Sequence, residues 1–283
     1  MSYLDNPIEE IHDTIVASLK AFFKRTGVKR TVLGLSGGLD SAVVAALAAE
    51  ALGCDNVHGI LMPSPYSTLH SISDAVDLCN NLNIKYDVIP IEKIYFRYMR
   101  DIAPIFAGNF QWDNTQENLQ ARIRGTILMA YSNRKGALLL NTSNKSELSC
   151  GYGTLYGDLA GSLMVIADVY KLQVYRLAAY LNAGEEQVPV HTIEKQPSAE
   201  LRDGQKDTDS LPPYSLLDPV LCALNDDGLT PEEIKASGVD ASLVDTVVKM
   251  KKAASFKVHQ MPQIIKVSDH PLLPCSKWVT PEY

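Results

Sequence analysis

The sequence Ser36-Gly37-Gly38-Leu39-Asp40-Ser41 lies between a short apolar run, Thr31 to Leu35, and an alanine-rich run, Ala42 to Leu52. The first run predicts a buried strand, and the second predicts a helix packed closely against a sheet. Free backbone N–H groups and the helix dipole attract phosphate at the start of such a helix. Two adjacent glycines also allow a tight turn and a close approach of the backbone to an anion. The segment therefore predicts a strand-to-helix turn that binds phosphate.

The polar side chains of this glycine turn support the same interpretation. Ser36 and Ser41 add hydroxyl donors. Asp40 beside a polyphosphate is expected to bind Mg²⁺, because the metal offsets both negative charges. The turn lacks the lysine of GxxxxGKS/T and does not match GxGxxG, so the two commonest nucleotide-binding loops are excluded. A glycine turn that only lets a strand and a helix pack together is the alternative interpretation.

Strands and helices are predicted to alternate on both sides of the turn. A helix over residues 8–27 precedes it, because apolar residues recur there at helical spacing. The elements expected after it are strand Val57–Met62, helix Ser71–Leu82, strand Tyr86–Ile91, helix Thr115–Asn133, strand Ala137–Asn141 and helix Lys171–Asn182. Such alternation predicts the α/β class, with a doubly wound, Rossmann-like parallel sheet flanked by helices and ligands at the carboxyl ends of the strands.

The segment after residue 190 is expected to differ from this core. Residues 196–213 are polar and resemble a mobile loop, which makes them a candidate lid. From Tyr214 the chain is expected to form mainly short helices, one of them capped by Thr230. Residues 270–283 contain three prolines and are expected to be irregular. We therefore expect one domain over residues 1–283, with a core over 1–190 and a mobile loop and helical extension over 191–283.

The composition limits the class of protein. The chain has 283 residues, of which 46% are hydrophobic and 21% charged, as in globular proteins with a sizeable core. No run approaches the roughly 18 apolar residues of a membrane span, and the first ten residues do not look like a signal region. Five scattered cysteines without a CxxC pair predict a reducing cytoplasm. The net charge of -7 argues against binding of nucleic acid through bulk electrostatics.

Two further polar clusters are candidates for a binding site. Asn118 and Arg122 fall on one face of the helix predicted over residues 115–133, although arginines on a helix more often form a solvated face. Thr142 and Glu147 follow the strand that ends at Asn141, so they are expected at the strand ends beside the glycine turn. A capping threonine and a surface glutamate are the default interpretation of that second cluster.

Together these motifs resemble the ammonia-dependent NAD synthetase family, a member of the N-type ATP pyrophosphatases. The glycine turn resembles the pyrophosphate loop of that superfamily, and the resemblance covers residues 8–265. It implies an adenine nucleotide alpha hydrolase-like fold and a ligase that forms a carbon–nitrogen bond. ATP, as co-substrate, would adenylate deamido-NAD, and ammonia would then displace AMP to give NAD. Mg²⁺ is the implied cofactor, and a homodimer is the implied assembly.

The resemblance also implies roles for individual residues. Asp40 and Glu147 would bind Mg²⁺, and with Lys171 they are the implied catalytic residues. The implied ATP-binding residues are Gly34, Ser36, Gly37, Gly38, Asp40, Ser41, Met62, Ser67, Arg122, Thr142, Lys171 and Ser198. The implied deamido-NAD-binding residues are Asn118, Tyr152, Asp158, Lys171, Asp207 and Lys257.

The sequence departs from the family pattern at two positions. Val258 stands where the family often has a second basic residue, and Thr208 replaces an acidic residue after Gln205-x-Asp207. Ammonia is the expected nitrogen donor, because the chain has no room for an amidotransferase domain. A separate glutaminase is the alternative, since Met62 to Thr68 resembles a segment found especially in glutamine-using relatives. Other open readings are a GMP-forming or tRNA-thiolating ligase of the same superfamily and a nucleotide-sensing module without turnover.

Overall fold

The computed structural model of the chain describes residues 3–106 and 111–283. Within these residues seven strands form one parallel sheet in the order β3-β2-β1-β4-β5-β6-β7. The strands are β1 (Arg30–Gly34), β2 (Val57–Leu61), β3 (Lys85–Val88), β4 (Ala137–Asn141), β5 (Leu163–Met164), β6 (Gln263–Ile265) and β7 (Trp278–Val279). The direction of winding reverses between β1 and β4, so the carboxyl ends of these two strands form a switch point of the kind at which open sheets bind ligands. The predicted fold class is confirmed.

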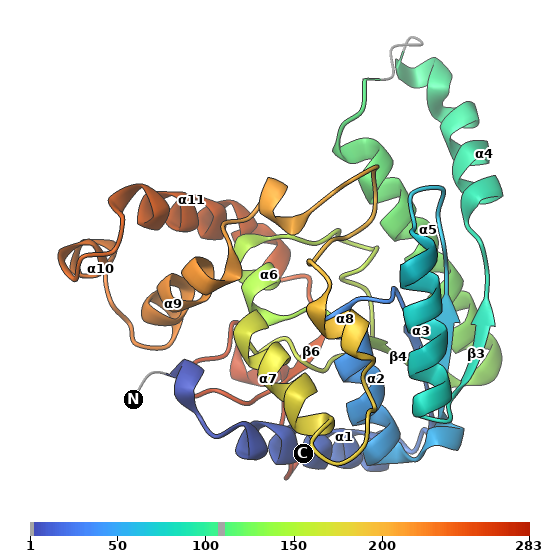
Figure 1. Cartoon of the computed structure of the whole chain (residues 1–283), viewed down its shortest axis with the longest axis horizontal. Coiled ribbons are helices and arrows are strands. Elements are labelled where there is room, and N and C mark those ends of the chain that lie inside the picture. The colour runs from blue at the N-terminus through green and yellow to red at the C-terminus, as the bar shows by residue number, and fades with distance from the viewer. Residues whose placement is uncertain (1–2, 107–110) are drawn as a thin grey trace.

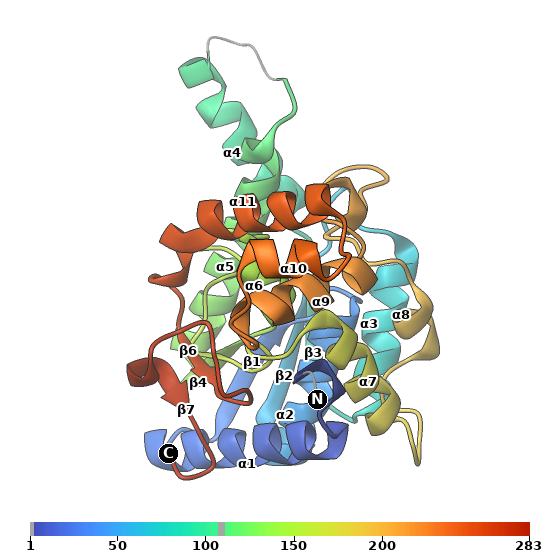
Figure 2. The ribbon, with the colours of Figure 1, turned by 90° about the vertical axis from the view of Figure 1, so that its left-hand side faces the viewer.

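Helices cover both faces of the sheet (Figures 1 and 2). In the first part of the chain they are α1 (Ile8–Thr26), α2 (Leu39–Leu52), α3 (Leu69–Asn81), α4 (Glu92–Ile102) and α5 (Asn114–Lys135). The later helices are α6 (Lys145–Cys150), α7 (Lys171–Leu181), α8 (Val190–Glu194), α9 (Tyr214–Asn225), α10 (Pro231–Ala236) and α11 (Ala241–Val258). Helices α1, α2 and α7 pack against one another on one face, whereas α5 packs on β1 and β4.

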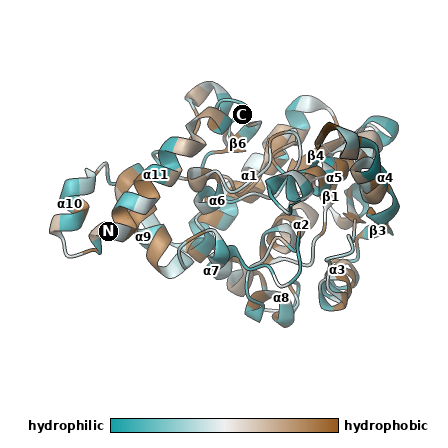
Figure 3. Ribbon diagram, turned by 90° about the horizontal axis from the view of Figure 1, so that it is seen from above, coloured by the Kyte–Doolittle hydropathy of each residue, from teal (hydrophilic) through white to brown (hydrophobic). Residues whose placement is uncertain are grey.

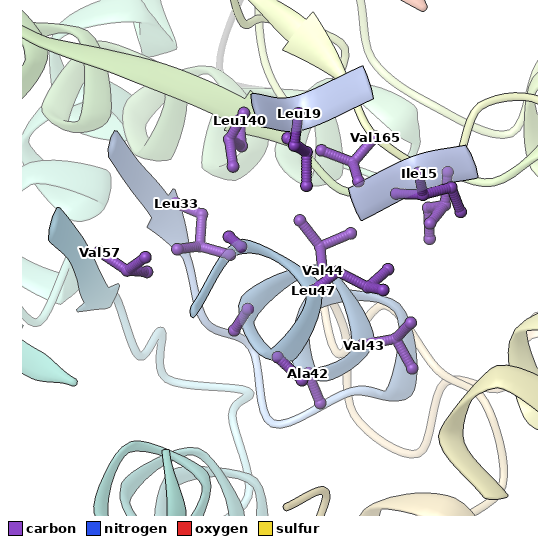
Figure 4. Packing of buried hydrophobic residues seen from close by; sticks show 14 of the residues in the cluster. Ile15, Leu19, Leu33, Ala42, Val43, Val44, Leu47, Val57, Leu140 and Val165 are labelled. Atoms are coloured by element: carbon purple, nitrogen blue, oxygen red, sulfur yellow. The ribbon is translucent and has the colours of Figure 1, made fainter. Parts of the chain in front are cut away.

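Alternation along the strands explains how the sheet has two apolar faces. Leu33 and Leu140 belong to the buried cluster that includes α1, α2 and α7 (Figure 4). Their neighbours Val32 and Leu139 belong to a separate cluster with α5. Successive side chains of a strand point to opposite faces, so strands covered on both sides are apolar throughout. The sheet is therefore buried on both faces around the switch point.

Helix α2 begins three residues earlier than predicted. Its N-cap is Gly38, with extended backbone, so Asp40 lies in the first turn of the helix. Gly37 before it has φ +76°, and a Cβ atom there would lie 2.1 Å from the carbonyl oxygen of Ser71. Both the backbone conformation and the close approach of α3 therefore require glycine at position 37. The predicted strand-to-helix turn is confirmed, with Asp40 fixed by the helix.

Helix α4 was not predicted from the sequence. It follows directly after the segment that contains β3, and no side-chain cap marks its start. Together with the start of α5 it projects from the body (Figures 1 and 2). Its aromatic residues include the buried Tyr95 and the exposed Phe96 and Tyr98.

The C-terminal part differs from the sequence prediction in two ways. Helix α11 has 18 residues and is not short. Residues 270–283, expected to be irregular, contain a 3-10 helix at Cys275–Lys277 and the strand β7. Strands of two or three residues are too short to show a period in the sequence. Helices α9, α10 and α11 pack together at one end of the molecule, which confirms the helical extension (Figure 3).

A buried lysine joins this extension to the core and to the start of the chain. Lys145 is fully buried, and its ammonium lies 3.0 Å from Asp168 and 2.8 Å from Asp226. It also donates to the hydroxyl of Ser268 at 3.0 Å, and the Tyr3 hydroxyl donates to the carbonyl oxygen of Asp168 at 2.8 Å. A buried charge is tolerated only when its partners are close, so Tyr3 near the start of the chain and Ser268 after β6 are fastened at one point. In the described chain, no helix combines the length and the apolar character that crossing a membrane requires.

Candidate active site

A cavity of about 290 Å³ lies at the switch point, next to the carboxyl ends of β1 and β4. Its walls come from the glycine turn, the end of β2, helix α5, the turn over residues 157–160, the start of α7 and residues 195–201. The predicted site residues that line it are Gly34, Ser36, Gly38, Asp40, Ser41, Met62, Ser67, Thr142, Glu147, Tyr152, Asp158, Lys171, Ser198 and Asp207. Residues separated by up to 173 positions are thus brought to one cavity.

The carboxylate of Asp40 has a partner on each oxygen. The ammonium of Lys171 donates to one oxygen, and the side-chain amide of Asn144 donates to the other at 2.9 Å. Asn144 is also the N-cap of α6, because its side-chain oxygen accepts from the backbone N–H of Glu147 at 3.0 Å. One asparagine therefore ties the glycine turn to the helix that carries Glu147. Asn144 was not predicted as a site residue from the sequence, although a capping position three residues before Glu147 is its signal.

Burial and charge together perturb this group of side chains. Burial, and then the negative charge of Asp40, raises the pKa of Glu147 well above its ordinary value. Burial disfavours the charge of Lys171, but the attraction of Asp40 and Glu147 outweighs it and raises the pKa of the lysine. Lys171 is therefore positively charged at neutral pH. Two carboxylates and one ammonium leave the group short of positive charge whenever both acids are ionised.

This donor set fits a divalent cation. Carboxylate oxygens are the ligands that Mg²⁺ prefers, and Mg²⁺ commonly takes one or two carboxylates together with phosphate oxygens and waters. A cation between Asp40 and Glu147 would remove the repulsion that raises the pKa of Glu147. In residues 3–106 and 111–283 no group of three or more His, Cys, Asp or Glu side chains is placed to hold a metal. The site therefore offers a divalent cation two protein carboxylates, and substrate oxygens would complete its ligands.

The glycine turn is held in shape by its own hydroxyl groups. The backbone N–H of Gly38 donates to the Ser36 hydroxyl oxygen at 3.1 Å, and the Ser41 hydroxyl donates to the Gly38 carbonyl at 3.0 Å. These bonds fix the turn at the start of α2, where the helix dipole favours an anion. An oxyanion would thus meet a turn that is already ordered.

Four predicted site residues do not line the cavity, namely Gly37, Asn118, Arg122 and Lys257. The last three instead hydrogen-bond the turn over residues 151–158. Lys257 donates to two backbone carbonyls at 2.7 Å, Arg122 donates to a third at 3.3 Å, and Asn118 accepts from a threonine hydroxyl at 2.7 Å. Their contacts in this structure shape the turn that presents Tyr152 and Asp158 to the cavity.

Arg124 lines the cavity, whereas Arg122 points to the neighbouring turn. Burial lowers the pKa of Arg124 to about 10, so the side chain stays positively charged at neutral pH. Its Nε donates to the carbonyl oxygen of Met62 at the end of β2, at 3.1 Å. Only Arg122 was predicted as a site residue, because helical spacing alone does not show which of two arginines faces the sheet.

Residues 195–207 lie over the cavity and are fastened to the start of α3. The carboxylate of Glu200 accepts from the Ser71 hydroxyl at 2.6 Å and from the backbone N–H of Thr68 at 3.1 Å, and it lies 3.0 Å from the ammonium of Lys195. Burial opposes ionisation of Glu200, but the hydrogen bonds from Ser71 and Lys195 outweigh it and lower its pKa. Nothing in the sequence joined Glu200 to Ser71 across 129 residues, so this contact was not predicted.

Asp207 closes the same segment from the other side. Its carboxylate accepts from the Tyr152 hydroxyl at 3.2 Å and from the Tyr214 hydroxyl at 2.9 Å, and burial raises its pKa. Thr208 next to it is exposed, and Val258 packs against an apolar cluster that includes Leu148. The two departures from the family pattern therefore lie outside the wall of the cavity.

The arrangement is suited to bind a polyphosphate beside a second ligand. The ammonium groups of Lys171 and Lys195, the guanidinium of Arg124 and the glycine turn all face one cavity. The carboxylates of Asp158 and Asp207 lie in the same wall. Asp158 is exposed to solvent, so its carboxylate is open to a second ligand. Such a site can hold ATP and position a reacting group against its phosphates.

Comparison with known proteins points to the same chemistry. Residues 11–262 match the profile of the NAD synthase family. The chain is 45% identical over 262 residues to the glutamine-dependent NAD(+) synthetase of Thermotoga maritima. The aligned region covers 92% of this chain and 45% of that protein. The chain thus spans about half the length of the curated relatives that it matches.

Two solved structures give the same result. The NH3-dependent NAD synthetase from Campylobacter jejuni, in complex with the nitrate ion, has a TM-score of 0.73 and 33% identity over 92% of this chain and 100% of that chain. The glutamine-dependent NAD+ synthetase from Acinetobacter baumannii, in complex with ADP, has a TM-score of 0.65 and 34% identity over 94% of this chain and 48% of that chain.

Proposed function

Because this chain belongs to the NAD synthase family, we propose that it is a ligase that converts deamido-NAD into NAD at the expense of ATP. The observation that carries the proposal is the convergence of Asp40 from the glycine turn with Glu147 and Lys171 at the switch point of the sheet. A GMP-forming or tRNA-thiolating ligase is not favoured, because the family match extends over residues 11–262 and not over the glycine turn alone.

In the first step the nicotinate carboxylate of deamido-NAD attacks the α-phosphorus of ATP, and pyrophosphate leaves. The carboxylate needs this activation because it is a poor electrophile. The glycine turn receives the pyrophosphate with backbone N–H groups and the hydroxyls of Ser36 and Ser41. Lys171 neutralises charge around the transferring phosphate. Mg²⁺, held by Asp40 and Glu147, would supply further neutralisation of the phosphate charge.

In the second step ammonia attacks the carbonyl carbon of the NAD-adenylate, and AMP leaves. This step needs no covalent enzyme nucleophile, so the protein acts by placing the reactants and excluding water. We assign deamido-NAD to the wall that contains Tyr152, Asp158 and Asp207. Asn118, Arg122 and Lys257 support it by holding the turn over residues 151–158. The rest of the wall is assigned to ATP. It includes the glycine turn beginning at Gly34, the end of β2 at Met62, and also Ser67, Thr142 and Ser198.

The nitrogen donor is proposed to be ammonia. This proposal is supported by the match to the full length of a structure described as NH3-dependent, at 33% identity. A separate glutaminase that delivers ammonia is the alternative. Supplying the pure protein with ammonium or with glutamine separates the two, and equal rates with glutamine alone would contradict direct use of ammonia.

The proposal also includes a homodimer in the cytoplasm, as expected from the family resemblance and from the scattered cysteines. Light scattering measures the mass directly. A species of 31.1 kDa alone, with substrates present, would contradict the dimer.

The decisive experiment measures AMP and pyrophosphate release in the presence of ATP, Mg²⁺ and ammonium. Release that depends on deamido-NAD, with NAD formed in equal amount, is the expected result. Nicotinate mononucleotide, which lacks the adenylate half, serves as the matched acceptor and should react much more slowly. ATP bound without turnover would instead identify a nucleotide-sensing module.

A further inference from the structure

A buried carboxylate outside the cavity joins the two helices that present Glu147 and Lys171. Asp218 lies on α9, and one of its oxygens accepts from the Ser146 hydroxyl at 2.6 Å. Its other oxygen accepts from the backbone N–H of Leu172 at 2.9 Å. The Ser146 hydroxyl oxygen in turn accepts from the backbone N–H of Lys171, also at 2.9 Å.

These contacts are at the first turns of two helices. Lys171 and Leu172 are the first residues of α7, and Ser146 lies in the first turn of α6, next to Glu147. The first N–H groups of a helix have no partner within the helix. Asp218 satisfies one of them directly and a second through the hydroxyl of Ser146. The separation of the two helix starts is therefore set by a side chain from a third helix.

Asp218 is fully buried and does not line the cavity, and neither does Ser146. Among the described residues no lysine, arginine or histidine forms an ion pair with Asp218. A buried carboxylate without such a partner is costly unless hydrogen bonds satisfy it, and both oxygens of Asp218 accept one. Lys171 and Glu147, at the starts of the two helices that Asp218 joins, line the cavity.

We propose that Asp218, acting through Ser146, is a positioning residue that sets Lys171 and Glu147 at the separation required for adenylation of the substrate. The inference rests on the proposed function. Asp218 does not line the cavity, so its loss should reduce the rate of the chemical step and leave substrate binding largely intact. A small displacement of a catalytic group lowers the rate by up to about 100-fold.

The test compares three single variants of the full chain. Asp218→Asn has one acceptor oxygen in place of two, so only one of the bonds from Ser146 and Leu172 keeps its direction, and the other requires the Ser146 hydroxyl to rotate and accept from the new amide. Ser146→Ala removes the link to Lys171. Ser132→Ala is the matched control. Ser132 lies near the carboxyl end of α5, is also buried, and donates a 2.6 Å bond to the carbonyl oxygen of Ala137 in β4. All three variants are expected to melt at a temperature lower by roughly 2–4 °C.

The kinetic readout separates positioning from stability. For Asp218→Asn and Ser146→Ala we expect kcat to fall about 10- to 100-fold while KM for ATP changes less than about threefold. For Ser132→Ala we expect kcat within about twofold of the wild-type value. The double variant Asp218→Asn/Ser146→Ala should lose no more than the worse single variant, because both changes break one connection.

The proposal is overturned if Asp218→Asn and Ser146→Ala keep kcat like the Ser132→Ala control, or if their losses multiply in the double variant. If a variant does not fold, Asp218→Glu takes its place. Its kcat and its KM for ATP are measured separately, as for the other variants. Absence of turnover in the wild-type protein would be a different outcome, since it contradicts the proposed function and not the positioning role.

Discussion

The side-chain amide of Asn144 donates a 2.9 Å hydrogen bond to the carboxylate of Asp40, across 104 residues of sequence. The same side chain caps α6 through the backbone N–H of Glu147. The cap and the alignment of Asp40 are therefore separable functions of one residue. If Asp40 binds Mg²⁺ as proposed, loss of the partner that orients its carboxylate should reduce metal affinity or activity by about 10- to 100-fold.

Asn144→Ser is expected to keep the helix cap and lose the bond to Asp40, because a serine hydroxyl caps a helix but does not reach as far. We predict a loss of about 10- to 100-fold in turnover with little change in melting temperature. Steady-state kinetics and thermal unfolding measure the two effects. Equal activity of the variant and the wild-type protein would show that Asp40 needs no support from α6.

Asp40→Asn and Glu147→Gln are predicted to abolish turnover that depends on Mg²⁺ and to leave the fold intact. Glu147→Gln should not reduce stability, because burial and then the charge of Asp40 already raise the pKa of this acid and disfavour its charged form. The measurement is AMP release against Mg²⁺ concentration, with near-UV circular dichroism as the control for folding. Unchanged Mg²⁺ saturation curves in both variants would remove these residues from the metal site.

Gly37→Ala is predicted to inactivate the protein through the glycine turn. The added Cβ would lie 2.1 Å from the carbonyl oxygen of Ser71, in addition to the strain of a positive φ of 76°. Gly27→Ala is the matched control, since Gly27 has φ +72° and nothing within 4 Å of its Cβ position. Both changes should cost roughly 1–2 kcal/mol of backbone strain. Only Gly37→Ala should lower ATP turnover, by about 100-fold, and equal turnover in the two variants would contradict a tight turn.

The stability difference between the wild-type protein and Asp218→Asn is predicted to depend on pH. Burial raises the pKa of Asp218 from its ordinary value of 3.8 to about 6, against hydrogen bonds from Ser146 and Leu172. The nearby charges of Lys171 and Asp40 act on it in opposite directions. Between pH 3.8 and about 6 the folded state therefore keeps a proton that the unfolded state has lost. The wild-type protein loses stability as pH rises through this range to about 6.

The asparagine variant has no such group, so its melting temperature relative to wild type should increase from pH 4 to pH 7 and then level off. Thermal unfolding at constant ionic strength measures the difference. The same difference at every pH would show that Asp218 keeps its ordinary pKa.

Most of the first half of the fold, helix α4 excepted, was predictable because its strands and helices are long enough to show a pattern in the sequence. Strand β1, helix α2 and strand β4 are largely apolar, as expected for elements that are covered on both sides. Strands β5 and β6 have two and three residues, and they belong to the sheet only through their neighbours. Their place depends on long-range pairing that a local pattern does not contain.

The site was predictable to the level of motifs and not of contacts. The positions of Asp40, Glu147 and Lys171 followed from the strand ends and the family resemblance, and all three line the cavity. Asn144, Arg124 and Glu200 were missed, because each acts through a contact with a distant segment. Which of two neighbouring arginines faces the sheet depends on helix rotation, and this is fixed only by packing.

The buried Lys145 has a consequence for how the molecule opens. Its charge needs Asp168 and Asp226 together, and its contacts reach from Tyr3 to Ser268. Detachment of the segment around Ser268 would remove its hydrogen bonds to Asp168 and to Lys145 in the buried interior, so such local opening is suppressed. In deuterium oxide, the backbone amides around residues 168 and 268 should therefore exchange together, at the rate of global unfolding. They should not exchange at the faster rate of the amides at the chain ends.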